Sequence, residues 1–143
     1  MKKNVRTFLK NDEWKYLFIK HKEKWSWTLP WWHVDVWENV YDALKREIKE
    51  ELNLEIKIVW NKLGLDIKNL KEKPLPICIY KIKYKNKNKE EKKKLEYIFL
   101  SEIKSGVLKL QIEEIYDYKY FSKEEILKEK KIYKQVKQII EHI

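Results

Sequence analysis

The chain has 143 residues, 43% of them hydrophobic, which suits one domain with its own core. Its one cysteine, Cys78, excludes an intrachain disulfide and argues against a cysteine-based zinc site. The formal charge of +10 would favour polyanions such as RNA, but the lysines show no interleaved aromatic residues, so a nucleic-acid partner is not favoured.

The first third of the chain predicts strands followed by a helix. Val5–Leu9 and Lys15–Lys20 are typical of two strands joined by a turn, and Ser26–Leu29 indicates a third, short strand. A helix is expected over Val40–Leu52, because its apolar residues recur at helical spacing. Its boundaries are marked by Asn39, a favourable N-cap, and by Asn53, which tolerates the left-handed conformation.

The rest of the chain predicts further strands and two C-terminal helices in one domain, residues 1–143. The fold class is therefore α/β (α+β), with helices packed on a sheet. The charged run Lys85–Lys94 is expected to be a solvated hairpin loop. The expected strands are Glu55–Val59, Ile77–Tyr84, Leu95–Ile103 and Tyr116–Phe121, a short helix follows Ser122, and an amphipathic helix contains Ile132, Val136, Ile139 and Ile140.

No apolar run has the length of a signal peptide or a membrane span. We therefore expect a cytoplasmic protein with no membrane partner, present as a monomer or homodimer. His33 is expected to be a strand residue, and the aromatic residues Phe18, Tyr80 and Phe99 are more typical of a core than of base stacking.

The helix over Val40–Leu52 carries a cluster of three carboxylates. Glu47, Glu50 and Glu51 are spaced to lie on one patch, opposite the apolar face, and would repel one another at neutral pH. Hard divalent cations such as Mg²⁺ and Mn²⁺ prefer oxygen ligands and would relieve that repulsion. Taken alone, the cluster favours an ordinary charged helix face over a metal site.

The surrounding residues extend this cluster into a longer motif. Glu38 precedes the helix, Arg46 directly precedes Glu47, and Leu29–Pro30 lie upstream. The segment Trp32–Leu54 resembles the pattern G-x5-E-x7-R-E-U-x-E-E-x-G-U of the Nudix hydrolases, where U is a bulky aliphatic residue. Every charged and aliphatic position matches, and the two departures are Trp32 and Asn53 at the glycine positions.

This resemblance implies an α/β/α sandwich with a mixed β-sheet, and a metal-dependent hydrolase, with Mg²⁺ or Mn²⁺, acting on a diphosphate linked to another group. Glu50 and Glu51 would be the main metal ligands, and Glu47 either a ligand or the general base. Arg46 would pair with Glu38 in an orienting role. Backbone groups around four further residues would line the phosphate site: Leu29, Pro30, Trp31 and Trp32.

Other features leave alternatives open. Glu114 is either a further acid near the metals or an ordinary surface carboxylate beside Glu113. The substrate is expected to be a small nucleotide such as a ribo- or deoxyribonucleoside triphosphate. The alternatives are an RNA 5′-end pyrophosphohydrolase and a catalytically impaired binding module with the same fold.

Tryptophan stands where the family's loop has glycine. The chain has 7 tryptophans and 2 glycines, whereas glycine averages about 7% of residues. UGA is one base from the glycine codon GGA, and genetic codes differ in reading UGA as glycine or tryptophan. We hypothesise that UGA encodes glycine in the source and has been translated as tryptophan at six positions: Trp14, Trp25, Trp31, Trp32, Trp37 and Trp60.

Overall fold

A computed structural model describes residues 1–111 and 113–143 of the chain. A mixed seven-stranded sheet forms its centre, in the order β4-β6-β1-β2-β7, with β3 paired to β1 and β5 paired to β6. The elements in chain order are β1 (Lys2–Lys10), β2 (Tyr16–Lys20), β3 (Trp31–His33), α1 (Val40–Leu52), β4 (Glu55–Val59), β5 (Cys78–Lys85), β6 (Glu91–Ser105), β7 (Asp117–Phe121), α2 (Lys123–Lys128) and α3 (Lys134–Ile140).

The sheet is organised around the parallel pairing of β1 and β6. Nine residues of β1, from Lys2 to Lys10, face Lys94 to Glu102 of β6 in continuous register. The middle of β1 is buried on both faces, because helices cover both sides of the sheet there. Its side chains alternate between the two cores, with Val5 and Leu9 on one side and Phe8 on the other.

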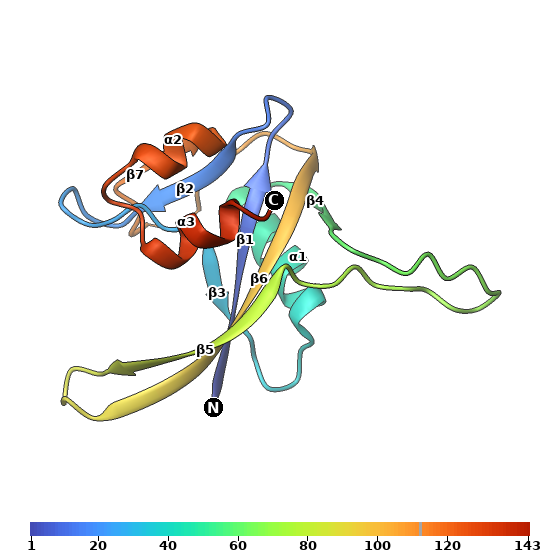
Figure 1. Cartoon of the computed structure of the whole chain (residues 1–143), viewed down its shortest axis with the longest axis horizontal. Coiled ribbons are helices and arrows are strands. Elements are labelled where there is room, and N and C mark those ends of the chain that lie inside the picture. The colour runs from blue at the N-terminus through green and yellow to red at the C-terminus, as the bar shows by residue number, and fades with distance from the viewer. Residues whose placement is uncertain (112) are drawn as a thin grey trace.

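Helices pack on both faces of this sheet (Figure 1). On one face, α1 buries Leu44, Ile48 and Leu52 against the sheet. On the other face, α2 and α3 bury Ile126, Val136 and Ile140. The expected α/β/α sandwich is therefore confirmed.

The ends of α1 follow from its sequence. The Asn39 side chain accepts a hydrogen bond from the Asp42 backbone N–H at 2.9 Å, which satisfies one free donor of the first turn. Asn53 ends the helix at φ 60°, the left-handed conformation that asparagine tolerates. Gly106 packs against this end so closely that an added Cβ would lie 2.5 Å from the Asn53 carbonyl oxygen. These contacts fix the helix relative to the end of β6.

Two expectations about strands were wrong. Ser26–Leu29 forms no strand, because only Trp27 and Thr28 make isolated bridges, and the strand lies instead at Trp31–His33, paired with β1. The run Lys85–Lys94 is not all loop: β6 begins at Glu91, and the turn is confined to residues 86–90. Lysines can occupy these strand positions because the projecting hairpin leaves their side chains in contact with solvent.

Two segments extend from the body of the protein (Figure 1). One is the β5–β6 hairpin, at the lower left. The other is the irregular segment of residues 61–76, at the right, where Glu72 accepts hydrogen bonds from the backbone N–H groups of Leu63, Gly64 and Leu65. Within the described part of the chain, no helix has the length and apolar character needed to cross a membrane.

Candidate active site

Arg46 is the centre of the charged cluster on α1. Its Nε and Nη2 atoms donate to the two carboxylate oxygens of Glu38, at 2.9 and 2.8 Å. It also donates to Glu47 at 3.1 Å and to Glu50 at 3.0 Å. The bond to Arg46 lowers the pKa of Glu38, whose side chain is only 4% exposed. One guanidinium thus holds the loop before α1 against the helix and fixes two of its carboxylates.

Glu47 is a half-buried member of the carboxylate cluster, with 18% of its side chain exposed. Burial raises its pKa, Arg46 opposes that shift, and the charges of Glu50 and Glu51 raise it further. Glu50 and Glu51 thus disfavour the charged form of Glu47, which is the direction expected for neighbouring carboxylates. Within residues 1–111 and 113–143, no three His, Cys, Asp or Glu side chains form a ready-made metal site. The donors still suit a hard divalent cation, since all three are carboxylates on one helix face.

Glu51 faces a small cavity of about 150 Å³, lined by Ile19, His21, Trp31 and Trp32. Glu114 lies elsewhere, exposed in a turn, and lines a second cavity of about 550 Å³. Trp31 and His21 form part of the wall of both. Glu51 and Glu114 thus line different cavities that share Trp31 and His21 as lining residues.

Trp31 also borders a third cavity. This one has about 480 Å³ and lies between the sheet and α3, with Arg6, Tyr80 and Glu96 among its lining residues. His21 lines it too, and its Nε2 atom is buried without a hydrogen-bond partner among the described residues. A smaller residue at position 31 would open the three cavities toward one another beside Glu51.

The residues expected around the phosphate differ in exposure. Leu29 and Pro30 are buried, and Leu29 lines the 480 Å³ cavity. Trp32 is 9% exposed and belongs to the core under α1, whereas Trp37 is 76% exposed. Trp31, Trp32 and Trp37 therefore form no single exposed patch, because Trp31 and Trp32 point to opposite faces of the sheet and Trp37 lies beyond β3.

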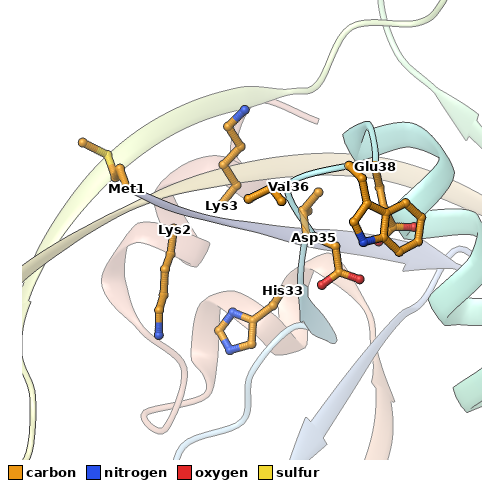
Figure 2. A pocket seen from close by; sticks show the side chains of 9 residues that line it. Met1, Lys2, Lys3, His33, Asp35, Val36 and Glu38 are labelled. Carbon is orange, nitrogen blue, oxygen red and sulfur yellow. The ribbon is translucent and has the colours of Figure 1, made fainter.

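The loop between β3 and α1 borders a larger cavity of about 670 Å³. Figure 2 shows Lys2 of β1 beside His33 of β3, with Asp35 reaching from the loop above them. As expected, His33 is a strand residue. Burial lowers its pKa, and the positive charges of Lys2 and Lys94 lower it further.

Sequence reasoning missed a row of polar residues across three strands. His33, Asn4 and Glu96 face one another in register on β3, β1 and β6. The His33 Nδ1 and Asn4 Oδ1 atoms are 2.7 Å apart, and the Asn4 amide points at Glu96 at 3.5 Å. Glu96 is 1% exposed and accepts two hydrogen bonds from Arg6, at 3.0 and 3.2 Å. The available signal was the spacing of Asn4-x-Arg6 and Lys94-x-Glu96, which places both polar side chains of each strand on one face.

Two of the six tryptophans that we hypothesise to be glycine in the native protein have backbone conformations that favour glycine. Trp14 has φ 61° and Trp60 has φ 156°. A bulky aromatic residue is strained at positive φ, whereas glycine adopts it without steric cost. Trp27, the tryptophan outside these six, is 9% exposed and packs its ring edge-to-face on Phe121.

Comparison with known proteins identifies the family. The family model described as NUDIX domain matches residues 2–143. This chain belongs to the Nudix family and is a Nudix hydrolase. Members of this family generally act on nucleotide substrates with divalent metal ions.

Solved structures agree on the fold. A NUDIX-family hydrolase from Clostridium perfringens superposes with a TM-score of 0.72 at 20% identity, covering 98% of this chain and 96% of that one. A MutT protein from Bacillus halodurans gives a TM-score of 0.73 at 16% identity, covering 99% of this chain and 81% of that one.

One curated relative is closer in sequence over a shorter region. It is an RNA pyrophosphohydrolase from Ruthia magnifica subsp. Calyptogena magnifica, 31% identical over 84 residues. The match covers 53% of this chain and 47% of the relative, so about half of each protein is compared.

Proposed function

We propose that this chain hydrolyses a nucleoside diphosphate linked to another moiety, with a small nucleotide such as a ribo- or deoxyribonucleoside triphosphate as substrate, and that it requires Mg²⁺ or Mn²⁺. The observation that carries this proposal is the Arg46–Glu38 clamp, which holds the loop against a helix face bearing Glu47, Glu50 and Glu51. A structural helix would have no need to gather three carboxylates beside a cavity that Glu51 lines.

Glu50 and Glu51 are assigned as the main metal ligands, with Glu47 as a further ligand or the general base. A bound divalent ion would neutralise charge on the phosphate oxygens and lower the pKa of a water molecule. Arg46 acts through Glu38 as a positioning residue, and the Leu29–Trp32 backbone faces the phosphates. Glu114 lines a cavity that shares Trp31 and His21 with the cavity of Glu51, and it is a candidate additional ligand.

The test is hydrolysis of nucleoside triphosphates, with and without Mg²⁺, by the unmodified chain and by two matched variants. Glu51→Gln keeps the side-chain volume but removes a ligand charge, and should abolish phosphate or pyrophosphate release. Glu55→Gln is the control, because Glu55 is exposed on β4 outside the cluster, with Lys49 at 3.7 Å. Equal activity of the two variants would contradict the assigned site.

We further propose that glycine occupies positions 14, 25, 31, 32, 37 and 60 in the native protein. Support comes from the positive φ of Trp14 and Trp60 and from Trp31 filling the space between three cavities. Replacing all six would raise glycine from 2 to 8 residues and lower tryptophan from 7 to 1.

Peptide mass spectrometry of the protein from its own source, across Lys24 to Lys45, decides this point. Glycine masses at positions 25, 31, 32 and 37 would mean an open phosphate loop. Tryptophan masses would favour the alternative of an impaired binding module with the same fold. UGG codons at these positions would exclude recoding.

An RNA 5′-end pyrophosphohydrolase is the second candidate. It is favoured by the matched relative of that name and by the formal charge of +10. Both candidates cleave a phosphate anhydride with the same residues of α1. They differ in the group attached to the phosphates, which is a single nucleoside in one candidate and a polynucleotide in the other. A competition assay with both substrates distinguishes the two candidates.

A further inference from the structure

The β5–β6 hairpin carries half of the net charge of the protein. Residues 78–97 contain eight lysines and three glutamates, a net charge of +5 out of +10. The sequence suggested that these lysines lack interleaved aromatic residues. The structure corrects this, because the aromatic and basic residues that alternate along β5 and β6 meet across the hairpin.

The pairing of β5 with β6 sorts their side chains into two faces. Tyr80, Ile82 and Tyr84 face Glu96, Lys94 and Lys92, respectively, on one side. The opposite side presents Lys81, Lys83 and Lys85, facing Leu95, Lys93 and Glu91. We call the group Arg6, Tyr80, Tyr84, Lys92 and Lys94 the aromatic–basic surface.

Contacts within the aromatic–basic surface hold its members together. The Lys94 Nζ lies 5.2 Å from the Tyr84 ring centroid and 3.3 Å from Glu96 Oε1. Arg6 also binds Glu96, so two cations share one buried carboxylate and leave a net positive charge. Among the described residues, Lys92 forms one ion pair, an exposed one with Glu90 at 3.5 Å, which contributes little to stability and is readily exchanged.

This surface runs into the cavity beside the candidate active site. Arg6, Tyr80 and Lys94 line the 480 Å³ cavity, which also contains Trp31, the wall it shares with the cavity of Glu51. Tyr84 and Lys92 continue outward along the projecting hairpin (Figure 1). Tyr80 and Tyr84 are four residues apart, or about 13 Å along a strand, roughly the length of four stacked nucleotides.

We propose that the aromatic–basic surface binds a single-stranded polynucleotide whose 5′-terminal phosphates enter the site beside α1. This inference rests on the second candidate of the proposed function, an RNA 5′-end pyrophosphohydrolase, and deepens it by naming the surface that binds the polynucleotide. Phosphates bind Lys92, Lys94 and Arg6, while bases stack on Tyr80 and Tyr84. Such alternation of cations and aromatic rings supports sequence-independent binding of single strands, because every base has a face that can stack.

The test measures binding of a fluorescent, 5′-triphosphorylated single-stranded RNA of ten nucleotides, by anisotropy at several salt concentrations. Lys92→Ala should weaken binding and reduce the slope of log K against log salt by about 0.7, the value for one lost phosphate contact on a single strand. Lys93→Ala is the matched control, since it removes the same charge one residue away on the opposite face. Tyr84→Ala should weaken binding about tenfold, and Tyr84→Phe should retain it.

Hydrolysis of a nucleoside triphosphate by the same variants separates the two proposals. If Lys92→Ala and Tyr84→Ala lose RNA binding but hydrolyse the mononucleotide normally, the surface is supported. Equal losses from Lys92→Ala and Lys93→Ala would overturn it, because binding would then follow net charge alone. If Lys92→Ala weakens RNA binding and Lys93→Ala does not, but the protein hydrolyses neither substrate, the binding surface is supported and the proposed function is refuted.

Discussion

Arg46 donates two hydrogen bonds to the Glu38 carboxylate, of 2.9 and 2.8 Å, and thereby joins the loop before α1 to the middle of the helix. A lysine cannot reproduce this fork. We expect Arg46→Lys to fold normally and to lower kcat about 10- to 100-fold, the usual cost of losing a group that orients metal ligands. Lys45→Arg, at the exposed neighbouring position, is the control in the same kinetic assay and should be neutral.

Divalent metal should stabilise the folded chain through α1. Binding to the native state alone adds about 2.7 kcal/mol at a metal concentration of 100 Kd. The Tm measured by calorimetry should therefore rise with Mg²⁺ or Mn²⁺ and fall again with a chelator. The double variant Glu50→Gln/Glu51→Gln should show no such rise. An unchanged metal response in that variant would move the metal site away from α1.

Trp14 gives a stability test of the glycine proposal. Its φ of 61° costs a bulky residue about 1–2 kcal/mol, whereas glycine has no such penalty. Trp14→Gly should therefore raise the free energy of unfolding in urea, even though it removes the contact of Lys10 Nζ 3.5 Å above the indole ring. Trp27→Gly is the opposite control, because Trp27 is in the core, and should cost about 3–5 kcal/mol. A loss of stability in both variants would argue that Trp14 is native.

His33 should titrate below its ordinary pKa of 6.5, since burial and the charges of Lys2 and Lys94 disfavour the imidazolium. Glu96 and Asp35 act in the opposite direction but do not reverse the shift. The folded state therefore favours neutral His33, so its contribution to stability is present above pH 6.5 and is lost as the pH falls through the lowered pKa. NMR titration of the three histidines measures this shift directly. His33→Gln should flatten the fall in stability between pH 7 and pH 5.

The boundaries of α1 were predictable because their causes are local. The apolar residues repeat at helical spacing, and the side chain of Asn39 and the backbone of Asn53 terminate the helix through contacts within a few residues. The Arg46–Glu38 pair was also accessible, because family resemblance supplied a contact that spans only 8 residues. Local chemistry therefore predicted the part of the site that lies on α1.

The polar row was beyond such reasoning because its members meet only through the sheet. Asn4 and Glu96 are 92 residues apart, and nothing near either residue reveals their register. The same limit applies to the hairpin, where Tyr84 and Lys92 come together only when the position of the turn is known. Trp31 and Trp32 were treated as loop residues, and their pairing with β1 likewise depends on a distant strand.

The parallel pairing of β1 with β6 has a consequence for biosynthesis. β1 is synthesised before β6, its central neighbour, and the paired residues Asn4 and Glu96 are 92 positions apart. At ordinary elongation rates this delay lasts roughly 5–20 s. During that interval β2, β3 and α1 become available to β1, but Val5, Phe8 and Leu9 lack the neighbours that β6 supplies. A chain interrupted before Glu91 would never complete its sheet.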